Sequence, residues 1–207
     1  MARSADRLRA FIAIDIPDEL RDAIHEISKR LRKTGADARW VRTESMHLTL
    51  RFLGDEVPCD KVEAIGSALH NHLTSIGQFA LTVQELGAFP NTTKPRVVWL
   101  GIEPHEGALP ELYEAVERAV EEAGWAKEDR PFAAHLTLGR VRSPSGIGKL
   151  REVLERGLSE PVGTMTVEKV SLIRSTLTPQ GPVYETLKTV TLQPRQQVSC
   201  EPQNVRA

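Results

Sequence analysis

The tetrapeptide His-Leu-Thr-Leu occurs twice in this chain, at residues 47–50 and at residues 135–138. Leucine makes up about a tenth of the residues and threonine rather less, so chance would place Leu-Thr-Leu after another histidine only about once in a few hundred cases. Successive side chains of a strand point to opposite faces. In each copy, therefore, the two leucines can enter a core while the histidine and the threonine share the other face.

These four polar side chains suit the cleavage of a phosphoester. One neutral imidazole can take a proton from an attacking water, and a second, protonated imidazole can give a proton to the leaving oxygen. An ordinary histidine pKa of about 6.5 makes both forms available near neutrality. Threonine hydroxyls can donate hydrogen bonds to phosphoryl oxygens. We therefore take His47, Thr49, His135 and Thr137 as the candidate catalytic residues.

A cation should also stabilise the phosphate. Strict alternation puts Arg51 on the same face as His47 and Thr49, whereas Arg140 falls on the face opposite His135 unless a β-bulge or the strand end intervenes. Either arginine can equally be an ordinary surface charge. Acid, base and charge stabilisation would then all come from side chains, and we expect no metal and no other cofactor. Two histidines without a third ligand fall short of a zinc site, and no carboxylate cluster suits magnesium or manganese.

Composition narrows the class of protein. The chain has 207 residues, 40% of them hydrophobic, which suits one large domain or two intimate lobes around a proper core. Its net charge of −1 argues against a general nucleic-acid coat but allows one local phosphate pocket. Cys59 and Cys200 show neither disulfide nor metal spacing, and the apolar run at residues 11–14 is too short for a signal peptide or a membrane span. We expect a cytoplasmic protein without membrane contact.

Hydrophobic periodicity predicts alternating helices and strands. Their order and the absence of a Gly-, Pro- or Ser-rich linker indicate an α+β fold of two lobes that share one cleft, with largely antiparallel sheets. We expect one bilobal domain over residues 1–192 and a flexible polar tail over residues 193–207. The expected strands are 8–16, 47–53, 79–87, 96–102, 133–142, 164–175 and 183–192, and the expected helices are 18–33, 58–75, 106–124 and a segment around 150–158.

The pattern resembles the two-histidine phosphoesterase superfamily, whose mark is the paired His-x-Thr-x motif. Within it, the chain is similar to the bacterial and archaeal RNA 2',3'-cyclic phosphodiesterases, historically called 2'-5' RNA ligases. The resemblance runs from about residue 8 to residue 192. The matching stretches are residues 9–17, 47–54, 95–101, 130–140 and 175–184.

The resemblance implies two pseudo-symmetric lobes with helices outside and a central cleft lined by both motifs. It implies hydrolysis of a terminal 2',3'-cyclic phosphate to a 2'-phosphate, with a possible reverse ligation. By carry-over, His47 would be the proton donor, His135 the proton acceptor, and Thr49 and Thr137 would hold the phosphate. Arg140 would be a further phosphate contact. RNA ends or small nucleotides would be the substrates, and we expect a monomer.

Other interpretations stay open. The two histidines can be strand residues hydrogen-bonded to neighbouring backbone, although the duplicated pair favours catalysis. The substrate can instead be a 2'-5' linked or small cyclic nucleotide. The chain can also be a non-catalytic nucleotide-binding module, but binding alone does not require two proton-transfer groups.

The remaining histidines and the aromatic residues carry weaker predictions. The histidines lie on or near expected helices, where we expect solvated surface positions. Aromatic side chains near the motifs could stack on a nucleobase, but we expect packing roles for them. The histidines concerned are His25, His70, His72 and His105, and the aromatic residues are Phe11, Trp40, Phe52 and Tyr184.

Overall fold

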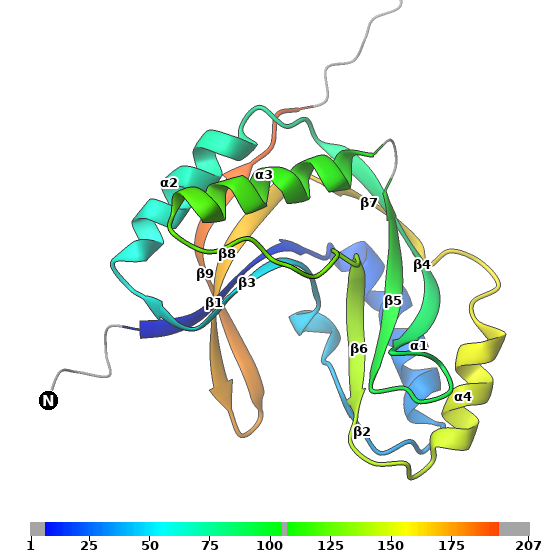
Figure 1. The fold of residues 1–207 in the computed structure, drawn as a ribbon. Helices are drawn as coiled ribbons and strands as arrows, with labels where there is room; N and C mark the ends of the chain where they lie inside the picture. The colour runs from blue at the N-terminus through cyan, green and yellow to red at the C-terminus, as the bar shows by residue number, and fades with distance from the viewer. Residues whose placement is uncertain (1–6, 105–106, 195–207) are drawn as a thin grey trace, which may run out of the picture.

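A computed structural model of the chain describes residues 7–104 and 107–194, which fold into two antiparallel sheets (Figure 1). The four-stranded sheet has the order β3–β1–β8–β9, and the five-stranded sheet has the order β2–β6–β5–β4–β7. The strands are β1 Arg7–Asp15, β2 Ala38–Trp40, β3 His47–Pro58, β4 Phe79–Phe89, β5 Val97–Pro104, β6 His135–Val141, β7 Gly163–Val167, β8 Lys169–Thr178 and β9 Gly181–Thr191.

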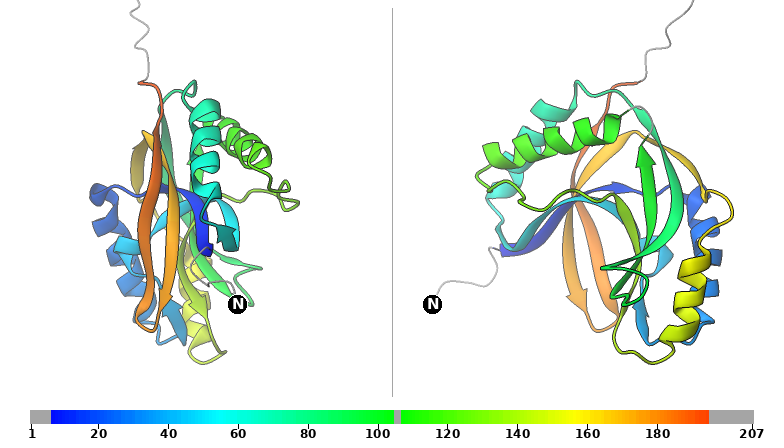
Figure 2. Two further views of the ribbon diagram at one scale, coloured as in Figure 1. Left: turned by 90° about the vertical axis from the view of Figure 1, so that its left-hand side faces the viewer. Right: turned by 45° about the vertical axis from the view of Figure 1, so that its right-hand side comes forward.

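Each sheet is covered by helices on one face (Figures 1 and 2). Helices α2 and α3 pack against each other over the four-stranded sheet, whereas α1 contacts β7 and α4 contacts β4 of the other sheet. The helices are α1 Asp18–Arg32, α2 Lys61–Leu73, α3 Ala108–Glu122 and α4 Ile147–Arg156, and a short 3-10 helix, η1, spans Thr43–Ser45. None of the helices described is both long and apolar enough to cross a membrane.

The leucines of both motifs lie in the hydrophobic core. Leu48, Leu50, Leu136 and Leu138 are each at most 4% exposed and belong to one core cluster that includes residues of both sheets and all four α-helices. Because strands alternate, the histidine and the threonine of each motif lie on the face away from the helices. We call this face of each sheet its motif face.

The expected α+β fold of two antiparallel lobes is confirmed, but the lobes are interleaved along the chain. Strands β1 and β3 from the N-terminal part join β8 and β9 from the C-terminal part, and the middle of the chain builds the other sheet. The single strand expected over 164–175 is wrong, because β7 and β8 are separate strands in different sheets. The chain passes here directly from one sheet to the other, and hydrophobic periodicity alone does not show this change.

Smaller differences concern element ends. Strand β3 continues past Gly54, where its end was expected, and the short strand β2 was not predicted. The expected tail lies almost wholly outside the described residues. Gln193, its first residue, donates a backbone hydrogen bond to Ile76 and accepts one from Gln78.

A β-bulge falls at the same position of both motifs. In β3, Thr49 pairs with Ala13 and Arg51 with Ile12, so Leu50 is the extra residue. In β6, Thr137 pairs with Trp99 and Gly139 pairs with Val98, so Leu138 is the extra residue. A bulge places two residues opposite one. The side-chain alternation therefore reverses after the fourth residue of each motif.

This reversal overturns the expected position of Arg51. Its guanidinium is buried among the acidic side chains of the α3 region, 3.5 Å from both Glu117 and Glu128, and it donates a hydrogen bond of 2.5 Å to the Ala126 carbonyl. Phe52 takes the exposed position instead. Arg51 is thus part of the core, and Arg140, the counterpart of Phe52, is exposed.

Replacing Arg51 with methionine should therefore destabilise the fold. Glu117 is only 1% exposed, and the change leaves its carboxylate buried without a cation. We expect a loss of about 3 kcal/mol in the free energy of unfolding, measured by urea titration. The double variant Arg51→Met with Glu117→Gln should recover part of it. An Arg51→Met protein as stable as the parent would contradict this role.

Candidate active site

His47 opens β3 and is held between aromatic rings of the four-stranded sheet. Its imidazole stacks on Phe11, with ring centroids 4.5 Å apart, and meets the edge of Tyr184 at 5.2 Å. Phe11 and Tyr184 also contact each other at 5.3 Å. These three rings come from β3, β1 and β9, so pairing of these strands fixes the position of the imidazole.

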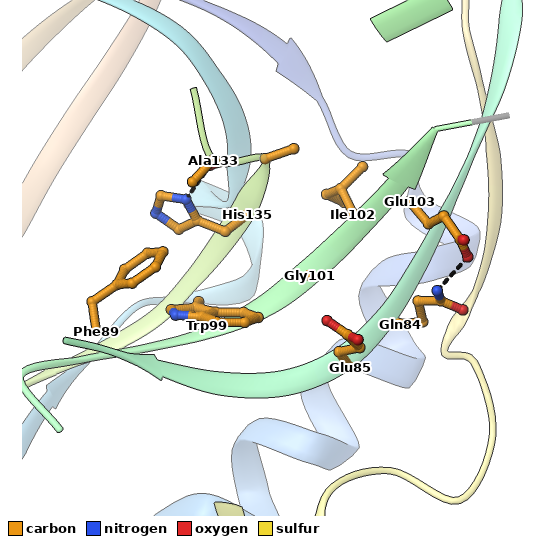
Figure 3. Close-up of a pocket in the computed structure, with 10 residues that line it drawn as sticks. Gln84, Glu85, Phe89, Trp99, Gly101, Ile102, Glu103, Ala133 and His135 are labelled. Atoms are coloured by element: carbon orange, nitrogen blue, oxygen red, sulfur yellow. Dashed lines mark hydrogen bonds between the residues drawn. The ribbon is translucent and has the colours of Figure 1, made fainter. Parts of the chain in front are cut away.

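His135 opens β6 and lies over the five-stranded sheet (Figure 3). Its ring meets Phe89 edge to face at 5.1 Å, and Phe89 contacts Trp99 at 5.2 Å. Trp99 lies flat across Gly87, where any Cβ would clash with the indole. Only glycine leaves room for this indole, which forms the floor beside His135.

Both imidazoles are anchored in the same way. Nδ1 of His47 lies 3.1 Å from the carbonyl oxygen of Ser45, and Nδ1 of His135 lies 2.7 Å from that of Ala133. In each case the acceptor is the backbone two residues earlier. A carbonyl only accepts, so Nδ1 carries a proton and donates it. The second nitrogen, Nε2, is then the atom that can gain or lose a proton in catalysis.

Burial lowers the pKa of His47 below its usual value, and the Ser45 carbonyl and the negative charge of Asp15 oppose this effect without cancelling it. Asp15 is the strand partner of His47 in β1. The free protein therefore favours the neutral imidazole at position 47 at neutral pH. A bound phosphate dianion or monoanion would favour the charged form instead.

The other predicted residues lie on the motif faces. Thr49 is exposed, Thr137 is half-buried, and the bulge at Leu138 brings Arg140 to the face of His135 and Thr137. This is the bulge that the sequence required for Arg140 to take part.

Two observations connect the motif face of one sheet with that of the other. Strand β3 contacts β6 directly. Burial raises the pKa of Tyr184, while the charges of Arg9 and Arg140 act to lower it. Arg140 belongs to the five-stranded sheet and Tyr184 to the four-stranded sheet. The cation of one face therefore acts on the phenol that packs against His47 on the other.

A pocket of about 350 Å³ lies beside His135 on the five-stranded sheet. Trp99 and Phe89 form its aromatic part, and the carboxyl groups of Glu85 and Glu103 line its other side (Figure 3). Gln84 donates a hydrogen bond to Glu103. The acidic groups disfavour a phosphate in this pocket but accept hydrogen bonds from a neutral group.

Sequence reasoning missed some of these residues. No sequence pattern indicated that Phe89 and Trp99 lie near His135, because their closeness to it depends on strand register. Phe11 and Tyr184 pack, as expected, but they pack on His47 itself. Phe52 lies under Arg9 at 4.4 Å, and Trp40 covers Gly139 on the core side.

The remaining histidines belong to neither motif, and the three that are described lie on helices α1 and α2. His25 contacts Thr43, His70 is exposed, and His72 is 2.7 Å from Glu122, while His105 lies outside the described residues. Within residues 7–104 and 107–194, no three His, Cys, Asp or Glu side chains gather in a way that could hold a metal ion.

The family model described as LigT like Phosphoesterase matches this chain twice, over residues 14–99 and 100–184. Each match contains one copy of the His-Leu-Thr-Leu motif. The chain belongs to the LigT-like phosphoesterase family. The predicted resemblance is thereby confirmed.

Curated LigT-like relatives extend over nearly the same length. A protein of Thermotoga maritima named RNA 2',3'-cyclic phosphodiesterase is 38% identical over 181 residues, 87% of this chain and 93% of its own. One of Methanothermobacter thermautotrophicus with the same name is 36% identical over 178 residues, 86% of this chain and 95% of its own.

Solved LigT-like structures share the fold. The protein TT0787 of Thermus thermophilus is 32% identical with a TM-score of 0.72, and the match covers 91% of this chain and 100% of that one. Escherichia coli LigT complexed with 3'-AMP is 27% identical with a TM-score of 0.72, covering 90% of this chain and 99% of its own.

The environment of His47 predicts how its pKa responds to substitution. In a proton NMR titration, His47 should titrate below pH 6.5. Phe11→Ala admits water to the ring and should raise this pKa, whereas Asp15→Asn removes an opposing charge and should lower it further. The His47→Gln variant, which lacks the signal, identifies the resonance. A His47 pKa above 6.5, or unmoved by both changes, would contradict the burial argument.

Proposed function

We propose that this protein hydrolyses the 2',3'-cyclic phosphate at RNA ends to a 2'-phosphate, by acid–base catalysis from two histidines and without a metal. The observation that carries the proposal is the matched anchoring of His47 and His135. Each histidine is the first residue of its motif strand, donates a hydrogen bond from Nδ1 to a backbone carbonyl and leaves Nε2 available for proton transfer. The names of the LigT-like relatives support the reaction class.

In the proposed reaction, Nε2 of neutral His135 accepts a proton from a water molecule, and the water oxygen forms a bond to phosphorus. Proton transfer by a positioned side chain contributes about 10²–10⁴-fold to rate. The Ala133 carbonyl supports this role, because it holds the Nδ1 proton and stabilises the imidazolium that forms.

His47 acts as the acid on the other side. The bond from phosphorus to O3' breaks, and the proton on Nε2 of His47 goes to O3', which leaves as the 3'-hydroxyl. The product carries a 2'-phosphate. Exchange of one proton from His135 to His47 through solvent restores the starting state.

The low pKa of His47 in the free protein fits this role once the substrate is bound. The negative phosphate is a charge of opposite sign next to the imidazolium, and it favours the protonated form. Since the free enzyme must carry a proton on His47 to react, kcat/KM should fall as the pH rises through the lowered pKa.

Thr49, Thr137 and Arg140 stabilise the phosphoryl oxygens in this proposal. Hydroxyl and guanidinium donors that point to developing negative charge lower the barrier, because they need no reorganisation during the reaction. Arg140 is exposed on the motif face and makes no ion pair within the described residues.

Substrate choice is tested by identifying products. The enzyme should convert RNA with a 2',3'-cyclic end to the 2'-phosphate, as resolved by phosphorus NMR or chromatography against both phosphate standards. Cleavage of 2'-5' linked dinucleotides or of small cyclic nucleotides in its place would favour the alternative substrates. A chain that binds nucleotides but cleaves none of them would be a binding module.

Loss of either histidine should abolish turnover but not binding. His47→Gln and His135→Gln should each lower kcat by about 10²–10⁴-fold, with nucleotide affinity retained in calorimetry. His70→Gln, on the exposed side of α2, is the matched control and should leave both parameters unchanged. Retention of full activity in either motif variant would refute the assignment.

Activity should survive removal of divalent cations. Incubation with excess EDTA followed by assay in metal-free buffer should leave kcat within about twofold, because the histidines and not a Lewis acid move the protons. A loss that returns when magnesium, manganese or zinc is added would exclude the two-histidine mechanism.

We also propose that the enzyme acts as a monomer in the cytoplasm. Both motifs and Arg140 come from one chain, so the candidate site is complete in a single copy. Light scattering after gel filtration checks the mass, and the 23.0 kDa species should carry full specific activity.

A further inference from the structure

An arginine pair lies at the edge of the five-stranded sheet beyond Thr137. Arg39 of β2 is the direct strand partner of Arg140 of β6, so both side chains extend side by side from the motif face of the five-stranded sheet. Side chains at opposed positions have Cβ atoms about 5 Å apart, and like charges at such positions repel. Both arginines are exposed.

These two cations lack carboxylate partners within residues 7–104 and 107–194. Arginines on the strands of the other sheet are matched: Arg9 pairs with Asp55, and Arg174 with Glu185 at 3.5 Å. A like-charge pair without an acidic neighbour costs stability unless an anion binds there.

The hairpin of β8 and β9 extends toward the same end of the molecule as β2, the strand that carries Arg39 (Figures 1 and 2). A Cβ on Gly181, the first residue of β9 after the hairpin turn, would lie 3.8 Å from Nη2 of Arg39. Further up the hairpin, the charge of Arg140 acts on Tyr184. Arg39 thus lies near the tip of the hairpin, and Arg140 lies within electrostatic reach of the aromatic rings around His47.

The hairpin presents apolar surface on this side. Ser175 pairs with Tyr184 and Leu177 with Pro182, so Leu177 points to the same face as Tyr184. Leu177 is 70% exposed. The pair β2–β6 thus presents cations, and the pair β8–β9 presents apolar and aromatic side chains. Proteins that bind single-stranded nucleic acid use this combination, because the cations bind the phosphates and the bases stack on the flat apolar surface.

The opposite flank of His135 is unsuited to phosphate. There the pocket presents Glu85 and Glu103. A polynucleotide whose cyclic end lies between the histidines would therefore extend its charged backbone toward Arg140 and Arg39.

We propose that Arg39 binds the internal phosphate next to the terminal nucleotide of an RNA substrate, with the neighbouring base over Tyr184 and Leu177. This inference rests on the proposed function and adds to it a preference for polynucleotides. A nucleoside 2',3'-cyclic phosphate has no internal phosphate and gains nothing from Arg39.

The test compares uridine 2',3'-cyclic phosphate with the dinucleotide UpU that carries the same cyclic end. The wild-type enzyme should favour the dinucleotide by about tenfold in kcat/KM, the effect of one charge-assisted hydrogen bond. Arg39→Gln should remove most of this ratio, and Arg142→Gln, a nearby exposed arginine outside the pair, should preserve it.

Two further measurements separate phosphate binding from a structural effect. A methylphosphonate in place of the internal phosphate should lower the wild-type ratio as Arg39→Gln does, and the two changes together should have no added effect. On RNA, Arg39→Gln should reduce the slope of log kcat/KM against log salt by about 0.7.

Equal losses on both substrates in Arg39→Gln, or a ratio that this variant does not change, would overturn the phosphate contact and leave the proposed function intact. A wild-type enzyme that hydrolyses neither substrate would overturn both.

Discussion

Burial of two leucines in each motif strand is the constraint on which the candidate site depends. Leu48, Leu50, Leu136 and Leu138 fix which face of each strand meets the core. Rotating either strand would bury polar groups and expose leucines, at a cost of several kcal/mol. The imidazole and hydroxyl of each motif are thereby forced onto the motif face, with no need for a flexible loop to place them.

The bulge after each motif then gives the two copies different uses. In β3 it sends Arg51 into an ion-paired core position and exposes Phe52, whereas in β6 it places Gly139 under Trp40 and exposes Arg140. The same backbone device therefore supplies a structural cation in one half and a candidate phosphate ligand in the other. The site is symmetric in its histidines and threonines and asymmetric in its cations and aromatic rings.

Sequence reasoning could find the motif residues because side chains alternate along a strand, so a repeated period-two pattern shows which residues share a face. It placed most helices and strands as well, since their apolar periodicity is strong. It failed for Arg51, because bulges depend on pairing between strands and leave no local pattern. The same limit hid Trp99 and Arg39, whose positions depend on register with β6. It also hid the junction of β7 with β8, where only the charged residues Glu168 and Lys169 stand between apolar stretches of two different sheets.

The central claim is that His47 and His135 act on one phosphorus atom from opposite sides. A crystal structure with uridine vanadate, a mimic of the pentacoordinate phosphorus, tests it most directly. The account predicts that Nε2 of each histidine lies at about 3 Å from a different vanadate oxygen, as hydrogen bonds require, on opposite sides of the vanadium atom. A vanadate bound to one imidazole while the other opens onto a separate surface would contradict it.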